Sequence, residues 1–215
     1  MTIANRIHLP DRVIRTALEP YGLSLTDNQV QAIRNYISLL LLWNHKVSLT
    51  SVVEPNEILN RHFGESMFAV RKVPIERGRL ADIGSGAGFP GLALKIACPQ
   101  LEVLLIEANT KKAAFLAEVK RALQLEWVEI LRSRLEDAPI GPDTLDFVTA
   151  RAVGGLPRLL FWSEKALSRQ GRLVLWLGRE DAEEISGTAG WKWREPVLLP
   201  GSRRRVVLIG QPESR

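Results

Sequence analysis

The glycine-rich stretch LADIGSGAGFPG, at residues 80–91, constrains the possible folds more than any other part of the sequence. It follows an apolar run that reads as a β-strand, and it leads into an apolar segment with helical spacing. Gly84, Gly86 and Gly88 occupy alternate positions, where glycine lets the chain turn tightly and lets a ligand touch the backbone. A strand, a glycine-rich turn and a helix in this order are typical of a nucleotide-binding site.

Strands and helices alternate from this stretch onward. Strands are expected at 79–84, 101–107, 126–131, 145–150, 171–178, 191–199 and 203–210, and helices at 88–98, 110–123 and 156–167. Such alternation predicts an α/β fold in which a mostly parallel sheet carries helices on both faces. Only a Pro-Gly turn separates the last two strands, so they are expected to form an antiparallel hairpin. This layout is that of the Rossmann-like class I methyltransferase sheet.

The beginning of the chain reads as helices without strands. A short helix opens after Pro10, Thr26 can cap a longer one, and Pro55 stands where the first turn of a third helix tolerates proline. Two units are therefore expected, an N-terminal helical cap at residues 1–75 and a methyltransferase domain at residues 76–215.

Composition narrows the class of protein further. A chain of 215 residues with 46% hydrophobic side chains can bury an ordinary core, and its apolar runs are too short to cross a membrane. The single cysteine, Cys98, excludes an internal disulfide and a cysteine metal cluster, and no other metal site is expected. The net charge of +5 and the run of arginines at 203–205 favour a polyanionic partner such as RNA. We expect a cytoplasmic protein.

Two classes of ligand fit the glycine stretch. Its last three glycines match the pattern of a dinucleotide site, whereas Asp82 followed by Gly84, Gly86 and Gly88 matches that of an S-adenosylmethionine site. An acidic residue suits the amino and sulfonium groups of S-adenosylmethionine, and Glu107, at the end of the next expected strand, can accept hydrogen bonds from a ribose. The Tyr-x-x-x-Lys motif of short-chain dehydrogenases is absent, so methyl transfer is favoured.

The absence of other motifs limits the atom that is methylated. After the fourth strand the sequence reads TARAVGG, without the Pro-Pro motif of enzymes that methylate exocyclic amines. Cytosine C5 methylation needs a cysteine nucleophile, and Cys98 lies on the first helix of the sheet, away from the expected site. Guanine N7 remains as a candidate because its lone pair carries no proton, so positioning and desolvation can suffice. Methylation of a small molecule stays open at this point.

Several segments then identify a family. The stretches LLLWNHKVSLTSVVEPNEILNRHFGES, DIGSGAGFPGLALKIACPQLEVLLIEANTKKAAFL, SRLED and FVTARAV occur in this order. Together they resemble the bacterial 16S rRNA guanine-N7 methyltransferase family, also known as the glucose-inhibited division protein B family. The resemblance implies a cytoplasmic enzyme that uses S-adenosylmethionine to methylate N7 of one guanine in 16S rRNA.

The resemblance also implies roles for individual residues. Gly84 and Phe89 would line the cofactor loop, and Glu107 would hold the ribose. Leu135 and Glu136 would border the adenine. Arg151 would lie beside the cofactor and the incoming guanine. The residues that match family positions beside the site are Trp43, Asn44, Thr50 and His62.

The chain departs from the family pattern at four positions. Glu65 stands where the family usually has aspartate, and Ser48 stands where it has asparagine. Leu177 and Gly210 replace two lysines, and Arg179 and the arginines at 203–205 can compensate for the lost charge.

We therefore predict Arg151 and His62 as catalytic residues, with a buried core histidine as the alternative reading of His62. The predicted cofactor-binding residues are Asp82, Gly84, Gly86, Gly88, Phe89, Glu107, Leu135, Glu136 and Arg151. The expected partner is 16S rRNA within the 30S subunit or a precursor, bound by a monomer that does not associate with a membrane. Two rival functions remain: a methyltransferase acting on a small molecule or a protein, and a cofactor-binding rRNA assembly factor with weak activity.

Overall fold

The computed structural model describes residues 8–213, so the outermost residues of the two expected units, 1–7 and 214–215, lie outside the described part. Within that part, eight strands form one sheet in the order β3-β2-β1-β4-β5-β8-β6, and the short β7 pairs with β8. Their bounds are β1 Arg77–Ile83, β2 Gln100–Ile106, β3 Val128–Leu131, β4 Leu145–Arg151, β5 Leu167–Gly178, β6 Trp191–Trp193, β7 Val197–Leu198 and β8 Arg205–Pro212. The strands from β3 to β5 are parallel, and β8 runs antiparallel to its neighbours. The predicted α/β class and the antiparallel C-terminal hairpin are confirmed.

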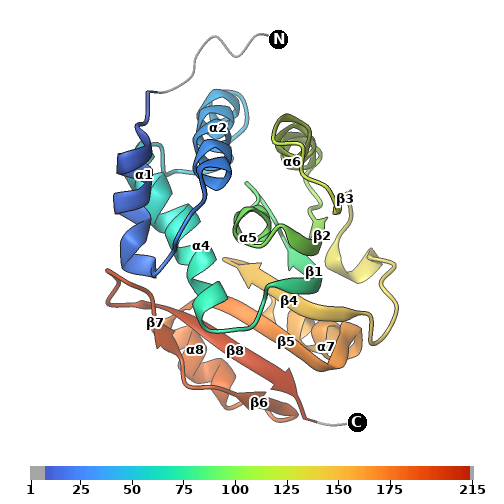
Figure 1. Ribbon diagram of the computed structural model, residues 1–215. Helices are drawn as coiled ribbons and strands as arrows, with labels where there is room; N and C mark the ends of the chain where they lie inside the picture. Colours follow the sequence, from blue (N-terminus) through green and yellow to red (C-terminus); the bar gives the residue numbers. More distant parts are fainter. Residues whose placement is uncertain (1–7, 214–215) are drawn as a thin grey trace.

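Helices cover both faces of this sheet (Figure 1). They are α1 Asp11–Leu18, α2 Asp27–Asn44, α3 Pro55–Ile58, α4 Glu65–Met67, α5 Gly91–Ala97, α6 Thr110–Ala122, α7 Leu156–Ala166 and α8 Arg179–Ser186. Short 3-10 helices lie at Glu19–Tyr21, Phe68–Arg71 and Leu135–Asp137, and Leu59–Gly64 is a π-helical turn between α3 and α4. Helices α7 and α8 pack on one face, and the other long helices pack on the opposite face.

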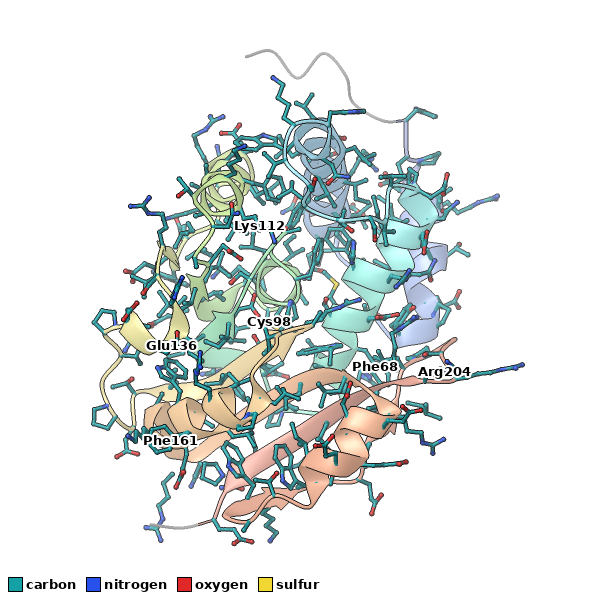
Figure 2. The ribbon with its side chains drawn as sticks, turned by 180° about the vertical axis from the view of Figure 1, so that it is seen from behind. Phe68, Cys98, Lys112, Glu136, Phe161 and Arg204 are labelled. Carbon is teal, nitrogen blue, oxygen red and sulfur yellow. The ribbon has the colours of Figure 1, made fainter. Side chains whose placement is uncertain are left out.

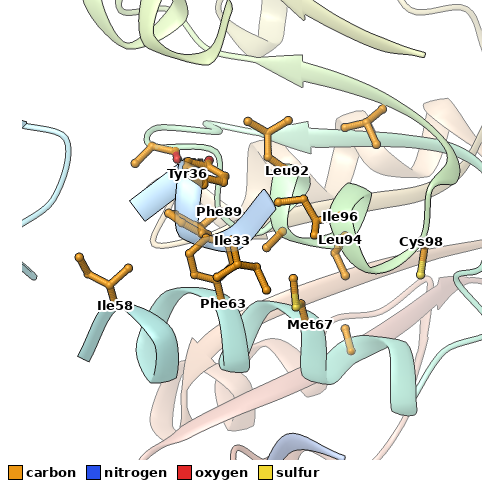
Figure 3. Packing of buried hydrophobic residues seen from close by; sticks show 14 of the residues in the cluster. Ile33, Tyr36, Ile58, Phe63, Met67, Phe89, Leu92, Leu94, Ile96 and Cys98 are labelled. Carbon is orange, nitrogen blue, oxygen red and sulfur yellow. Dashed lines mark hydrogen bonds between the residues drawn. The ribbon is translucent and has the colours of Figure 1, made fainter. Parts of the chain in front are cut away.

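The N-terminal helices bury their apolar faces in the same core as the sheet helices. Ile33, Tyr36 and Phe63 are fully buried in one cluster with Phe89 and Leu92, as Figure 3 shows. At the start of α2, Thr26 and Gln29 form the reciprocal bonds of a capping box, as the sequence predicts for Thr26. Because this core is continuous, the N-terminal segment is held directly against the helix that follows the glycine stretch.

Some local details differ from the expected elements or were not expected. Helix α5 begins at Gly91 and not at residue 88, because the backbone is still turning through the glycines. Asn109 caps α6, since its side chain accepts free N–H groups of the first turn. The strand expected at 191–199 is two short strands separated around Pro196, which has no N–H for a ladder. Helix α8 was not predicted; it buries only Ala182 and Ile185, too few apolar residues for a clear periodic signal.

Among residues 8–213, no helix is long and apolar enough to span a bilayer. Within the same residues, no three His, Cys, Asp or Glu side chains are grouped as metal ligands.

Candidate functional site

The glycine loop lies at the carboxyl end of β1, where its neighbours β2 and β4 also end. Gly84, Gly86 and Gly88 have φ values of 65°, 56° and 85°, in a backbone region that residues with a Cβ rarely adopt. Beyond its own turn, Gly86 faces open space, because a Cβ added there would meet only the Gly84 carbonyl oxygen, at 3.7 Å. Gly88 is crowded instead, since a Cβ added there would lie only 2.8 Å from Leu92 Cδ1. The loop therefore presents an open backbone at Gly86 and a packed one at Gly88.

Asp82 braces this loop from beneath. Its side chain is fully buried; Oδ1 accepts a 2.8 Å hydrogen bond from the Thr149 hydroxyl, and Oδ2 accepts the Gly91 N–H at 3.2 Å. Burial raises the pKa of Asp82 to about 7, although the hydrogen bonds from Thr149, Gly91 and Ser85 oppose that shift. The structure places this carboxyl group under the turn, at the start of α5, and away from the open face of the loop.

The raised pKa of Asp82 makes the free energy of unfolding depend on pH. The unfolded carboxyl has a pKa near ~4, so between that pH and about 7 only the folded protein holds the proton. This contribution to stability is complete at low pH and is lost as pH rises toward and through 7. Asp82→Asn removes the titrating group. We expect the melting temperature to fall less steeply between pH 5 and pH 8 for Asp82→Asn than for the parent, as measured by circular dichroism. Parallel curves for the two proteins would contradict this assignment.

Glu107 closes the loop from the side of β2. It is 8% exposed, Oε2 accepts the Gly86 N–H at 2.8 Å, and Oε1 accepts the Asn109 N–H at 2.7 Å. The carboxylate therefore lies beside the open backbone of Gly86, and each of its oxygens keeps a lone pair for a further donor. A carboxylate in this position can accept hydrogen bonds from ribose hydroxyls.

An aromatic stack connects the loop to the N-terminal helices. The Phe89 ring lies between Tyr36 and His62, with ring centroids 5.2 Å and 4.8 Å away and nearly parallel planes. Phe63 meets Tyr36 and Phe89 edge-on. The buried Tyr36 hydroxyl also donates a 2.6 Å hydrogen bond to the Ala87 carbonyl in the loop. Tyr36 was not predicted as a site residue, and its position within the apolar stripe of α2 was the only signal.

Tyr36→Phe tests this connection. The substitution keeps the ring and leaves the nearly buried Ala87 carbonyl without its donor, which should cost about 1–3 kcal/mol of unfolding free energy. We expect urea denaturation to show this loss and cofactor affinity to fall several-fold, because the loop is no longer tied to α2. Unchanged stability would mean that the Ala87 carbonyl finds another donor.

His62 lies in the π-helical turn and faces Thr50. Its Nε2 is 2.8 Å from the Thr50 hydroxyl, while its buried Nδ1 has no hydrogen-bond partner. Asn44 fixes the backbone around Thr50, accepting the N–H groups of Leu49 and Thr50 and donating to the Thr50 carbonyl. Burial, followed by the charge of Arg151, lowers the pKa of His62 to about 4. The imidazole is therefore neutral at physiological pH.

Arg151 ends β4 beside the glycine loop. Its Nη1 donates to the Arg61 carbonyl at 2.6 Å, and Nη2 lies 3.0 Å from a carboxylate oxygen of the buried Glu65. The next residue, Ala152, has a φ of 53°, which is unusual for a residue with a Cβ. From the same segment, Val153 reaches over Gly84, since a Cβ added to Gly84 would lie 2.9 Å from it. Arg151 and His62 are thus brought to the same edge as the loop.

The other predicted residues are more peripheral. Leu135 is partly buried in the short helix after β3, and Glu136 is exposed and forms an ion pair with Arg158 of α7. Trp43 packs against Phe115 of α6, with ring centroids 5.7 Å apart.

The four departures from the family pattern also have defined positions. Leu177 packs against the α7 and α8 side of the core, whereas Ser48 is exposed. At Gly210 a side chain would run into the Trp193 ring, because a Cβ added there would lie 2.6 Å from Trp193 Cε3, so lysine does not fit. Glu65 is buried beside Arg151. Arg203 and Arg204 are exposed, and Arg204 extends away from the body of the protein (Figure 2).

Most of the chain is similar in sequence to known proteins. Residues 29–191 match the family model described as GidB, rRNA small subunit methyltransferase G. A protein of Desulfitobacterium hafniense called ribosomal RNA small subunit methyltransferase G is 38% identical over 174 residues, which are 80% of this chain and 72% of that protein. A protein of the same name from Chloroflexus aggregans is 34% identical over 210 residues, 93% of this chain and 88% of the other.

Solved structures show the fold. A SAM-dependent methyltransferase from Aquifex aeolicus superposes with a TM-score of 0.63 at 16% identity, covering 74% of this chain and 94% of that one. A ribosomal protein L11 methylase from Lactobacillus delbrueckii subsp. bulgaricus gives a TM-score of 0.59 at 14% identity, with 72% and 80% covered. At these identities the likeness concerns the fold alone.

Proposed function

The chain belongs to the GidB family of rRNA small subunit methyltransferases, and from this premise we propose that it transfers a methyl group from S-adenosylmethionine to N7 of a guanine in 16S rRNA. The observation that carries the proposal is the convergence of the glycine loop, Glu107, Arg151 and His62 at one edge of the sheet. All four lie within the residues that match the family model.

The residues at this edge fit S-adenosylmethionine. The open backbone at Gly86 leaves space for the cofactor, and the Glu107 carboxylate beside it can accept the ribose hydroxyls. Leu135 offers a partly buried apolar surface for the adenine. The bound cofactor supplies an electrophilic methyl group. Asp82 supports this arrangement through the turn, since its carboxyl is occupied by Thr149 and Gly91.

Residues of the site then position the guanine. N7 carries no proton, so no general base is required. The lowered pKa of His62 makes its imidazole a weak base, which agrees with a role other than proton abstraction. His62 is held by Thr50 and stacks on Phe89, so it can form a fixed wall of the site. Arg151 stays cationic and can donate a hydrogen bond to guanine O6, which lies beside N7 and leaves the N7 lone pair free to attack the methyl group.

In this proposal, the RNA approaches the edge of the sheet at which the parallel strands end. Arg179, Arg203 and Arg204 are exposed at the neighbouring end of β5 and the turn before β8, where they can contact phosphates of a 30S subunit or its precursor. In this proposal the protein acts as a monomer in the cytoplasm.

The experiment is methylation of 30S subunits purified from cells that lack this modification. The protein is incubated with labelled S-adenosylmethionine, and the 16S rRNA is digested to nucleosides. Label in 7-methylguanosine is the expected result. Label in another nucleoside would refute the N7 assignment, and transfer that persists after removal of all RNA would favour a small-molecule or protein substrate. Binding of cofactor and rRNA without incorporation would favour an assembly factor.

A further inference from the structure

A buried carboxylate is shared by two arginines next to the site. Glu65 is 1% exposed; its Oε2 lies 3.0 Å from Arg151 Nη2, and its Oε1 lies 2.7 Å from Arg205 Nη2. Arg205 comes from the start of β8 and is much more exposed than Arg151, with 41% against 16% of the side-chain surface accessible. Each guanidinium is therefore paired with a different oxygen of the same carboxylate.

Further contacts hold the backbone of Glu65 and of the turn before it. Its main-chain carbonyl accepts a 2.7 Å hydrogen bond from the buried Trp176 Nε1 on β5. Its own segment follows the π-helical turn that carries His62, and Arg151 also donates to Arg61 in that turn. Strands β4, β5 and β8 thus all contact Glu65, so its backbone has little freedom to follow a moving arginine.

The sharing has a chemical consequence for Arg151. A carboxylate with two free oxygens favours a bidentate pair with a guanidinium, which would use two of the N–H groups on one edge of Arg151. With Arg205 on Oε1, Arg151 keeps a single bond to Oε2 and its bond to Arg61. Two cations on one carboxylate also leave an excess of positive charge at the edge where guanine is presented.

We propose that Arg205 is a positioning residue for Arg151, because by occupying Oε1 of Glu65 it prevents the bidentate pair and holds the Arg151 guanidinium toward the substrate. Arg205 itself does not contact the guanine or the cofactor. This inference rests on the proposed function for its kinetic consequences, whereas its structural part does not depend on that function.

The kinetic test compares Arg205→Met with Arg205→Lys. In methylation of 30S subunits, we expect Arg205→Met to lower kcat about tenfold, while KM for the subunits and Kd for S-adenosylmethionine change less than about twofold. Arg205→Lys should recover most of kcat, since an ammonium can also occupy Oε1. The matched control is Arg121→Met, which removes a comparable ion pair with Glu118 on the outer surface of α6 and should leave both constants unchanged.

A second variant tests the sharing itself. Glu65→Asp keeps the charge but shortens the side chain by one methylene, so the carboxylate cannot reach both arginines. Arg205→Met should therefore lower kcat about tenfold with Glu65 present and less than about twofold when added to Glu65→Asp. Equal effects in both backgrounds would show that Arg205 acts without Glu65 and would overturn the proposal.

Arginine side-chain NMR gives a readout that needs no activity. The Arg151 guanidinium resonances, assigned with Arg151→Lys, should shift in Arg205→Met and return toward their parent positions in Arg205→Lys. If the parent transfers no methyl group, the proposed function fails while this measurement still judges the positioning. Unchanged Arg151 resonances, or a raised KM with an unchanged kcat, would overturn the inference; the latter would make Arg205 a phosphate contact.

Discussion

Gly88→Ala should abolish high-affinity binding of S-adenosylmethionine. A Cβ at this position would lie only 2.8 Å from Leu92 Cδ1 and even closer to the Tyr36 hydroxyl oxygen, which is fully buried and cannot move aside. The φ of 85° adds the strain of a left-handed backbone. Together the overpacking and the strain should cost about 3 kcal/mol or more. The loop can relieve this only by moving away from α2, which displaces the open backbone at Gly86.

The measurement is calorimetric titration with S-adenosylmethionine, beside a thermal melt. We expect Kd to rise at least about a hundredfold, because a displacement near ~1 Å removes the aligned backbone contacts. Gly190→Ala is the matched control. Its φ of 82° imposes the same strain, but a Cβ there meets nothing within 4 Å, and the turn before β6 lies far from the loop. If both variants bind equally well, the crowding at Gly88 does not control the site.

Local sequence patterns predicted the sheet and the glycine loop because their causes are local. Alternating or continuous apolar runs define each strand, and Gly84 and Gly88 are required by the backbone of the turn itself. The approximate place of Glu107 follows from the same logic, since it ends the strand beside the loop. The family resemblance added the positions of Arg151 and His62, which periodicity alone does not mark as functional.

The contacts that organise the site could not be predicted, because they join segments far apart in the sequence. Tyr36 reaches the loop from α2, and Glu65 meets Arg205 of the last strand, far along the sequence. Nothing in the sequence near Asp82 shows that its carboxyl faces Thr149 and Gly91 instead of the open side of the loop. Arg203, Arg204 and Arg205 read as one basic run, and only packing distinguishes the last one, which turns inward to Glu65.

Glu107→Ala should lower the affinity for S-adenosylmethionine about a hundredfold. Hydrogen bonds to a charged acceptor contribute roughly 1.5–3 kcal/mol each, and the loss of two ribose contacts corresponds to about 3 kcal/mol or more. Part of the effect passes through the loop, because the Gly86 and Asn109 N–H groups also lose their acceptor. Glu102→Ala, at the exposed opposite end of the same strand, is the control and should bind like the parent.

A ligand variant separates the ribose contact from the effect on the loop. S-adenosylhomocysteine and its 2′,3′-dideoxy analogue differ only in the hydroxyls that Glu107 is proposed to accept. For the parent, Kd should be at least about tenfold lower for the hydroxylated ligand than for the analogue. Glu107→Ala should bind the two with nearly equal Kd. Ordering of the loop affects both ligands alike, so it cannot produce this difference. If Glu107→Ala retains the parent's full preference for the hydroxyls, another group holds the ribose and Glu107 serves only to fix the backbone at Gly86 and Asn109.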